Sequence, residues 1–531
     1  MQLTLDLGGA LDAKPLDHFW NRVVGAGRAN EGLRADWQEQ LRFAKAHGGF
    51  EYLRFHGLFH DDMFVYREVD GVVTPYFQYV DLLFDAVLDA GLRPFVEFGF
   101  SPPELARETK TVFWWGANGS PPTDNVKWAQ LVRATVEHWV ERYGIEEVRE
   151  WYFEIWNEPN LDPFFRGTKA EYFELYRVSV EAIKAVSGDL RVGGPATSNF
   201  VPDARFDGET EDTTQHAVVL EAEDLDALDW KPVWLADFLV YCHERSLPVD
   251  FVSCHPYPTD WALDEHNQGR KLTRGVDATP TDLRTLRALV DASPYPDAEI
   301  HLTEWNSSSS PRDYTHDYTQ AATYVVQANL QSIGLVDSLA YWTFTDVFEE
   351  SGAGQEPFHG GFGMLNQHGI PKPTMHAYRM LAALGDELVH QQDGTTVTRF
   401  SASGEVAAIV THYPPEVRLS VPASFDTRDV ADRTLATGRD EPLDVVLHGL
   451  RPGAVYTLEV LDPDHGSAMR EWERLGFPNN LSRADVASLR RAAEATLTST
   501  HTVEPDGTLR IATTLAPWSV ALLAPARIAA P

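Results

Sequence analysis

The sequence predicts a (β/α)8 TIM barrel with an additional C-terminal antiparallel β-sandwich domain, in the α/β fold class. Short apolar segments alternate eight times with helical patterns between residues 19 and 385. Polar residues collect at the C-terminal ends of the apolar segments, where the active sites of such barrels lie. After about Asp386 the pattern changes to short alternating segments separated by turns, which is typical of antiparallel sheets.

The predicted barrel strands are short apolar runs that end near glycine, proline or a polar residue. They comprise residues 19–27, 52–57, 93–99, 151–158, 190–195, 249–257, 299–305 and 338–344. Apolar residues at helical spacing predict helices over 36–47, 76–90, 124–143, 169–186, 233–245, 281–291, 317–332 and 374–384. An open doubly wound sheet would alternate in the same way, but no Gly-x-Gly-x-x-Gly loop opens a helix here. The closed barrel is therefore the preferred interpretation.

We divide the chain into a catalytic barrel domain, residues 13–385, and a β-sandwich accessory domain, residues 386–531. The predicted sandwich strands are 395–401, 406–413, 417–421, 454–460, 509–513 and 520–524, interrupted by a helix over 483–495. The first six residues alternate as well, so we expect the N-terminal segment 1–12 to add a strand to the sandwich. No linker rich in Gly, Ser or Pro separates the parts, which predicts rigid packing.

The charge balance limits the possible ligands. The chain has 79 acidic and 44 basic residues, a formal net charge of −35. Nucleic acids are bound by clustered Lys and Arg, so we expect no nucleic-acid partner and a neutral or cationic ligand. The acidity by itself is typical of a well-solvated surface.

The ends and the cysteines indicate an intracellular enzyme without a metal centre. The N-terminus lacks a basic region followed by an apolar one, and no apolar run reaches roughly 18 residues. We therefore expect no export by this route, no membrane span and a cytoplasmic location. Cys242 and Cys254 are too few for a disulfide framework and have no His/Cys set at ligand spacing, so we interpret both as structural thiols.

Two glutamates stand at the ends of predicted strands. The run 151–161 (WYFEIWNEPNL) is apolar and aromatic until Glu158, after which Pro159 ends the strand. Residues 299–306 (EIHLTEWN) place Glu304 in the same position. Either glutamate alone could be an ion-pair partner, but a glycoside hydrolase needs such a pair, one carboxyl to protonate the leaving oxygen and one to attack or to activate water.

The chain resembles glycoside hydrolase family 39, and within it the β-D-xylosidases, over nearly its full length. The resemblance is carried by residues 143–148 (YGIEEV), 153–161 (FEIWNEPNL), 192–196 (VGGPA), 249–253 (VDFVS), 301–306 (HLTEWN), 341–350 (YWTFTDVFEE) and 358–363 (FHGGFG). It implies a retaining mechanism with Glu158 as acid/base and Glu304 as nucleophile. The apolar neighbours of Glu158 and the charge of Glu304 would keep Glu158 protonated, as an acid requires.

The resemblance also implies substrate contacts. Asn157 is expected to hydrogen-bond the sugar 2-hydroxyl, with a turn-capping Asn as the alternative. His56 and His255 match the family's sugar-contacting histidines, although a buried His is often satisfied by a backbone carbonyl. Tyr257 is expected to orient Glu304, and Arg54 to keep it ionised.

The remaining candidates form the wall of the expected pocket. Trp342 offers a face on which a pyranose can stack, with a barrel-core Trp as the alternative. Glu349 or Glu350 is expected to accept hydrogen bonds from the terminal sugar and close the pocket for exo action. Phe113, Trp114 and Trp115 are interpreted as pocket wall or as ordinary packing.

Two loops and one substitution bear on specificity. The acidic insertion 200–230 is interpreted as a solvated loop, with an entrance element as the alternative, and the Gly-rich and aromatic segment 346–364 as pocket wall. Ser309 stands where family members often have a Tyr five residues after the nucleophile. Tyr257 or Tyr314 would then take over its hydrogen bond, or the leaving-group side would be more open.

We therefore expect a retaining exo-acting β-D-xylosidase that releases xylose from the non-reducing ends of xylo-oligosaccharides or aryl xylosides, with no metal or organic cofactor. The alternatives are α-L-iduronidase-like or α-L-arabinofuranosidase activity on the same scaffold. A catalytically inactive sugar-binding protein is the alternative outside the hydrolases. The sequence leaves the oligomeric state open.

Overall fold

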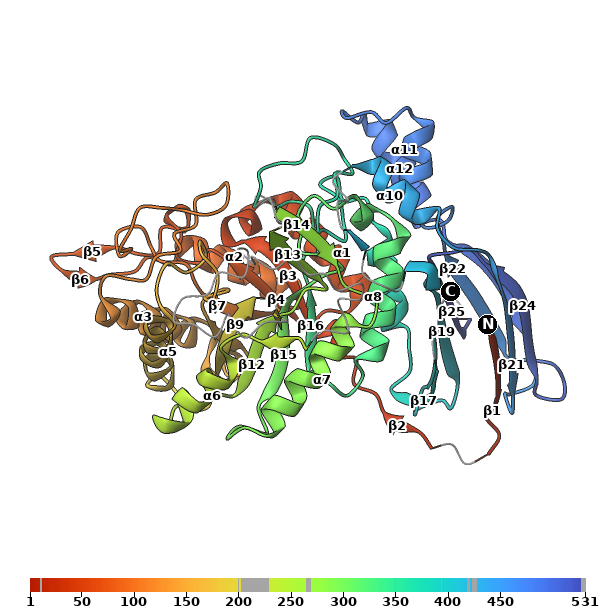
Figure 1. The fold of residues 1–531 in the computed structure, drawn as a ribbon, viewed down its shortest axis with the longest axis horizontal. Helices are drawn as coiled ribbons and strands as arrows, with labels where there is room; N and C mark the ends of the chain where they lie inside the picture. The colour runs from red at the N-terminus through yellow and green to blue at the C-terminus, as the bar shows by residue number, and fades with distance from the viewer. Residues whose placement is uncertain are drawn as a thin grey trace.

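Figure 1 shows the computed structural model of the chain. The structure describes residues 1–531 except 10–11, 199, 202–228, 264–268, 349, 393, 418–420, 423–426 and 527–531. In Figure 1 the barrel and its helices lie beside a pair of stacked sheets that contain the first and the last described strands of the chain.

Eight parallel strands close into a barrel in chain order, as predicted. They are β3 (Val23–Arg28), β4 (Tyr52–His56), β7 (Arg93–Phe98), β8 (Tyr152–Ile155), β9 (Arg191–Ser198), β12 (Phe251–His255), β15 (Glu299–Trp305) and β16 (Ser338–Tyr341). The pair β16–β3, with Tyr341 opposite Val24, closes the ring. The prediction for the first strand began too early: Phe19–Asn21 form a 3-10 helix, η1. The backbone N–H groups of Asn21 and Arg22 donate to the carbonyls of His18 and Phe19 within this turn, rather than to a neighbouring strand.

The eight predicted helices are also present. They are α1 (Ala35–Gly48), α2 (Gln78–Asp89), α3 (Asn125–Tyr143), α5 (Lys169–Lys184), α6 (Leu235–Glu244), α7 (Ala278–Asp291), α8 (Thr319–Gln331) and α9 (Pro373–Ala382). Local signals set several of the boundaries: Asp124 caps the first turn of α3, and Thr168 with Glu171 forms a capping box at α5. The short helix α4 (Ile145–Val148) was not predicted.

Short 3-10 helices and pairs of short strands lie in the loops of the barrel. They are the 3-10 helices η2 (Ala29–Leu33), η3 (Asp61–Met63) and η7 (Tyr314–Asp317), the hairpin β5 (Glu68–Val69) and β6 (Val72–Val73), the pair β10 (Phe200–Val201) and β11 (Lys231–Pro232), and the hairpin β13 (Thr259–Leu263) and β14 (Gly269–Thr273). The pair β10–β11 brackets the acidic insertion, most of which, residues 202–228, lies outside the described residues. Its role stays a prediction.

Two sheets form the C-terminal sandwich. One contains β1 (Gln2–Asp6), β21 (Glu441–His448) and β24 (Leu509–Leu515). The other contains, in spatial order, β2 (Lys14–Pro15), β17 (Glu387–Gln392), β18 (Thr395–Arg399), β19 (Val406–His412), β25 (Ser519–Pro525), β22 (Val455–Leu461) and β23 (Leu497–Thr502). As expected, the N-terminal strand joins the sandwich, but β1 runs parallel to β21, so this sheet is mixed. The division at residues 385 and 386 stays a prediction.

The predicted sandwich strand 417–421 falls mostly on residues 418–420, which lie outside the described residues. Pro415–Val417 form a 3-10 helix, η8, and β20 (Val421–Pro422) pairs with β14 of the barrel hairpin. The strands β17, β21 and β23 were not predicted, although Leu443, Val445 and Leu447 of β21 alternate and are buried.

The seven-stranded sheet is covered on both faces. From β19, Val406, Ala408 and Val410 point into the core between the two sandwich sheets. Ala407 and Ile409 point the other way and pack into the barrel's apolar core, where β19 and β25 lie against α8. The barrel and the sandwich therefore share one continuous buried layer.

Three further helices, α10 (Arg428–Leu435), α11 (Met469–Arg474) and α12 (Arg483–Glu494), lie beyond the edge of the sandwich (Figure 1). Only α12 was predicted. Trp472 and Leu489 of this group pack with Phe358 and Ile370, which belong to the segment that follows β16. Within the described ranges of the chain, no helix is long and apolar enough to span a membrane.

Candidate active site

The two glutamates meet at the C-terminal end of the barrel. Glu304 lies within β15, whereas Glu158 follows β8 in a turn where Trp156 and Glu158 adopt positive φ angles of 72° and 47°. The backbone N–H of Glu158 donates to the carbonyl of Ala196 at 2.9 Å, which holds the turn against β9. Non-glycine residues at positive φ are costly and concentrate at functional sites.

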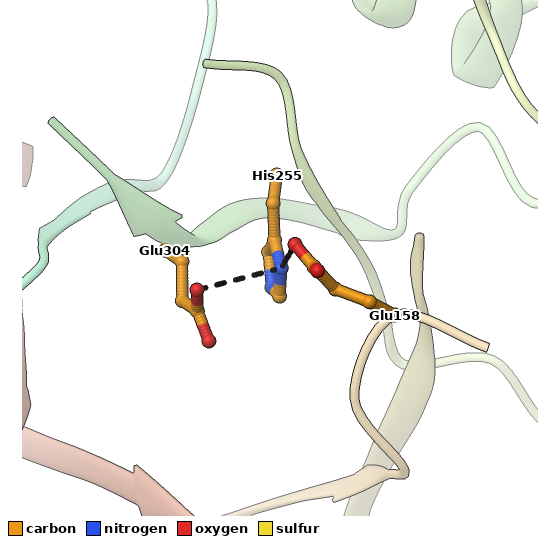
Figure 2. Close-up of side chains that lie close together, drawn as sticks. All are labelled: Glu158, His255 and Glu304. Carbon is orange, nitrogen blue, oxygen red and sulfur yellow. Dashed lines mark hydrogen bonds and ion pairs between the residues drawn. The ribbon is translucent and has the colours of Figure 1, made fainter. Parts of the chain in front are cut away.

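His255 lies between the two carboxylates (Figure 2). Its Nδ1 is 3.0 Å from Oε1 of Glu158 and 3.9 Å from Oε2 of Glu304. One oxygen of each glutamate and one nitrogen of His255 all lie within 4.8 Å of one another. Glu158 and Glu304 are each 6% exposed, so the site is deep but open to a small ligand.

Arg54 is the hub beneath Glu304. This fully buried side chain on β4 donates from Nη1 to Glu304 at 2.8 Å, from Nε to Glu154 at 2.6 Å and from Nη2 to Asn157 at 3.0 Å. Nη2 also lies 3.0 Å from Glu97. The guanidinium of Arg54 thus holds four side chains in place: Glu304, Asn157, Glu154 and Glu97.

His56 supplies a second positive charge. Its Nδ1 contacts Glu97 at 2.5 Å, and its Nε2 lies 3.1 Å from Oε1 of Glu304. Burial disfavours the imidazolium, but Glu97 and Glu304 outweigh that effect and raise the pKa of His56 to about 10. His56 is therefore a cation next to Glu304 at neutral pH.

The two catalytic candidates have opposite pKa shifts. Burial and the charge of Glu304 raise the pKa of Glu158 well above its ordinary value. Burial acts in the same direction on Glu304, but the hydrogen bond and charge of His56 and the guanidinium of Arg54 outweigh it and hold the pKa of Glu304 well below its usual range. One carboxyl is kept protonated and the other ionised, as an acid and a nucleophile require.

His255 is neutral in this arrangement. Burial lowers its pKa to about 3 against the charge of Glu304, and the positive charges of Arg54 and His56 act in the same direction as burial. The structure thus separates the two histidines that the sequence suggested: His56 is charged, and His255 is not.

The other predicted substrate residues surround this centre to different degrees. Asn157 is buried, with its Oδ1 bonded to Arg54. Tyr257 donates its phenol O–H to Oε2 of Glu304 at 3.2 Å, whereas the Tyr314 ring lies below Arg428. Which of them compensates for Ser309 stays a prediction. Trp342 is 1% exposed and packs against His56, with ring centroids 4.7 Å apart, and its role as a stacking face stays a prediction.

The aromatic wall separates into an inner and an outer part. Phe113 stacks on His56 at 6.2 Å and is half-buried. Trp114 is 69% exposed and therefore lies at the rim, not inside the pocket. Its backbone N–H donates to the carbonyl of Glu350 at 2.8 Å, which joins the loop after β7 to the loop after β16.

Glu350 belongs to the site, and Glu349 lies outside the described residues. Burial and the charge of Glu304 raise the pKa of Glu350 to about 8, against the positive charges of His56 and Arg312. At neutral pH this carboxyl can therefore donate as well as accept a hydrogen bond.

A buried ion cluster anchors the segment that carries Glu350. Nζ of Lys372 lies 2.7 Å from Asp317, 2.6 Å from Asp346 and 2.9 Å from the carbonyl of Gly361. Asp317 and Asp346 in turn accept from the backbone N–H groups of Gly360 and Gly363, each at 2.7 Å. Both ends of the loop from Asp346 to Gly360 are thereby fixed.

Among the described residues, Glu158, His255 and Glu304 have the spacing of a possible metal site. The chemistry does not fit a cation well, because Arg54 and His56 already place two positive charges on Glu304 and because Glu158 is kept protonated. The group is better described as an acid and a carboxylate bridged by a neutral imidazole.

Sequence reasoning assigned no role to Glu97, Glu154 and Thr303. Glu97 lies near the end of the predicted strand 93–99, among the polar residues that collect at strand ends. Glu154 and Thr303 lie inside their strands, and in the sequence nothing distinguishes them from other buried polar residues.

Comparison with known proteins identifies the family. The model of glycosyl hydrolases family 39 matches residues 4–510. The chain belongs to this family and is a glycosidase. A beta-xylosidase of Geobacillus stearothermophilus is 36% identical over 522 residues, which cover 95% of this chain and 92% of that protein.

Solved structures of family 39 agree with the fold. The family 39 enzyme of Xanthomonas axonopodis pv. citri is 34% identical, with a TM-score of 0.82, 98% of this chain and 96% of that chain being covered. A monomeric beta-xylosidase of Caulobacter crescentus CB15 is 32% identical, with a TM-score of 0.81 and 98% of each chain covered.

Proposed function

We propose that this family 39 glycosidase is a retaining, exo-acting β-D-xylosidase that releases xylose from the non-reducing ends of xylo-oligosaccharides or aryl xylosides. The main support is the pair Glu158 and Glu304, whose nearest described oxygens lie within 4.8 Å and whose pKa values are shifted in opposite directions. Retaining enzymes have carboxyls about 5 to 5.5 Å apart, whereas inverting enzymes need more room for a water molecule.

The reaction proceeds in two displacements. Glu304 attacks the anomeric carbon while Glu158 transfers its proton to the departing oxygen, which leaves a covalent glycosyl ester on Glu304 and a carboxylate on Glu158. Glu158 then takes a proton from water as that water attacks the anomeric carbon, and the ester bond to Glu304 breaks. Both carboxyls return to their starting protonation states.

Asn157 assists at the sugar ring. Because its Oδ1 accepts from Arg54, its N–H groups are oriented to donate to a substrate hydroxyl. A hydrogen bond to the 2-hydroxyl strengthens as positive charge develops on the ring, and it contributes mainly in the transition state.

The charge of the site favours a neutral sugar. Glu158, Glu304 and Glu350 surround the expected sugar position, and the nearby cations Arg54 and His56 are each bound to carboxylates. A uronate would bring a further carboxylate into this environment, which disfavours α-L-iduronidase-like activity. The name of the 36% identical Geobacillus protein, a beta-xylosidase, points to xylose as the neutral sugar.

Two alternatives, arabinofuranoside cleavage and sugar binding without catalysis, have less support than xylosidase activity. α-L-Arabinofuranosidase activity on the same scaffold would be a side reaction, because ring positions of that sugar can overlay those of xylose. A catalytically inactive sugar-binding protein is disfavoured, because the protonated and ionised carboxyls are both in place.

The experiment measures hydrolysis of p-nitrophenyl β-D-xylopyranoside by wild type, Glu304→Ala and Glu158→Ala, with and without azide. We expect Glu304→Ala to be inactive without azide. Glu158→Ala should still release the activated phenol and yield β-xylosyl azide, because azide attacks the glycosyl enzyme and needs no general base. Glu137→Ala, an exposed glutamate on α3, is the matched control and should behave as wild type.

Two outcomes would overturn the proposal. An azide adduct of α configuration from Glu158→Ala would exclude Glu304 as nucleophile. If wild type does not hydrolyse the xyloside but cleaves an α-L-iduronide, the substrate assignment is wrong, whereas the roles of Glu158 and Glu304 can stand.

A further inference from the structure

A hydrogen-bonded chain of four side chains starts at Glu158 and leads away from the pocket. Nδ1 of His255 lies 3.0 Å from Glu158, and Nε2 of His255 lies 2.9 Å from Oγ1 of Thr303. The hydroxyl of Thr303 donates to Oε1 of Glu154 at 2.7 Å. His255, Thr303 and Glu154 are all fully buried.

The direction of this chain is fixed at its far end. Burial, with nearby Glu97, raises the pKa of Glu154 above its ordinary value, whereas Arg54 acts in the opposite direction. Nε of Arg54 donates to Oε2 of Glu154 at 2.6 Å, a charge-assisted contact that favours the ionised carboxylate. An ionised carboxylate can only accept, so the single hydroxyl proton of Thr303 points to Glu154. Thr303 must then accept from Nε2–H of His255.

The direction of this chain determines whether Nδ1 of His255 donates to Glu158 or accepts from it. A neutral imidazole carries one proton, and with that proton on Nε2, Nδ1 is an acceptor. The hydrogen bond at 3.0 Å therefore requires a proton on the Glu158 carboxyl. The opposite tautomer, with a proton on Nδ1, would donate to Glu158 and stabilise its ionised form.

We propose that Thr303 and Glu154 are positioning residues for the general acid: they hold the proton of His255 on Nε2, so that Nδ1 accepts from Glu158 and keeps this carboxyl protonated until the leaving oxygen arrives. The inference rests on the role proposed above for Glu158. It assigns function to two residues that need not touch the substrate.

The other charged groups around the chain agree with this assignment. His255 faces Glu304 at 3.9 Å, beyond hydrogen-bond distance, and the positive charges of Arg54 and His56 disfavour a second proton on its ring. Glu158 faces Glu304 and Glu350, which favour its protonated form, while His56 and a hydrogen bond from Ser198 act in the opposite direction. With its proton on Nε2, His255 likewise favours the protonated form of Glu158.

The test compares Thr303→Val with Thr303→Ser. Valine has nearly the shape of threonine but cannot accept from Nε2–H, so the proton of His255 moves to Nδ1 and donates to Glu158. The pKa of Glu158 then falls, and we expect the alkaline limb of kcat/KM for a phenyl xyloside to move to lower pH by about 1 unit or more. Thr303→Ser retains the hydroxyl and should keep the wild-type profile.

Two further measurements separate this role from a structural one. With 2,4-dinitrophenyl xyloside, whose leaving group needs no acid, the alkaline limb of Thr303→Val should follow that of wild type. The 15N resonances of the His255 ring should show an unprotonated Nδ1 in wild type and Thr303→Ser, and a protonated Nδ1 in Thr303→Val.

The ring resonances need no substrate, so they separate this inference from the proposed function. A wild type without xylosidase activity but with an unprotonated Nδ1 would overturn the proposed function alone. A protonated Nδ1 in wild type, or an alkaline limb that Thr303→Val leaves in place for the phenyl xyloside, would overturn the inference.

Discussion

Replacing His56 with asparagine should move both limbs of the pH profile to higher pH. His56 is an imidazolium over the working range, because Glu97 and Glu304 raise its pKa to about 10 against the effect of burial. Its positive charge favours the ionised forms of both Glu304 and Glu158. Without that charge, both carboxyls hold their protons to higher pH.

The size of the expected pKa shift follows from the distance between His56 and Glu304. Nε2 of His56 is 3.1 Å from Oε1 of Glu304. At an effective dielectric constant of about 20, two unit charges at this distance interact by about 5 kcal/mol, which corresponds to nearly 4 pKa units as an upper bound. Arg54 remains 2.8 Å from Glu304 in the variant, so we expect the pKa of Glu304 to rise by roughly 2 to 3 units. The shift of Glu158 should be smaller, because His56 acts on it only through space.

The assay is kcat/KM for p-nitrophenyl β-D-xylopyranoside between about pH 3.5 and 9, which reports the free enzyme. Because the pKa of Glu304 is far below its usual range, the acid limb of wild type should lie below that window, and that of the variant should appear at its lower edge. The matched control is His301→Asn, another buried histidine next to a carboxylate, with Nε2 at 2.9 Å from Glu299 near the start of β15. Its limbs should not move. Unchanged limbs in His56→Asn would refute the assignment of a charged His56.

Two stability predictions follow from the site's support. Arg54→Met leaves Glu97, Glu154 and Glu304 without their shared cation and should lower the free energy of unfolding in guanidinium by about 3 to 5 kcal/mol, whereas Arg133→Met, which removes an exposed pair with Glu137, should cost less than about 1 kcal/mol. Equal losses would contradict the importance of the buried hub. Gly363→Ala would push a Cβ into the backbone N of Asp346 and should cost about 1 to 3 kcal/mol, whereas Gly188→Ala, with no atom within 4 Å, should stay within about 0.5 kcal/mol. A Gly363→Ala variant as stable as wild type would mean that the segment after β16 is less tightly packed than its contacts indicate.

Local sequence patterns were sufficient for the barrel and for its two carboxylates. The predicted strand that ends on Glu158 before a proline, and the one with Glu304 near its end, have signals confined to a few neighbouring residues. The parallel arrangement of strands then brings their ends to one face whatever the details of packing. Where the pattern failed, at 19–21, hydrogen bonds within a 3-10 turn replaced the expected strand pairing.

The protonation states depended on contacts that only the tertiary structure provides. Arg54, Glu154 and Glu304 are 100 to 250 positions apart along the chain, yet they form one hydrogen-bonded unit. The sequence contained two similar candidates, His56 and His255. In the fold, His56 lies beside Glu97 and is a cation, whereas His255 lies between Glu158 and Thr303 and is neutral. A pKa depends on burial and on charges within a few ångströms, and those distances are set by the closure of the barrel rather than by the order of residues in the chain.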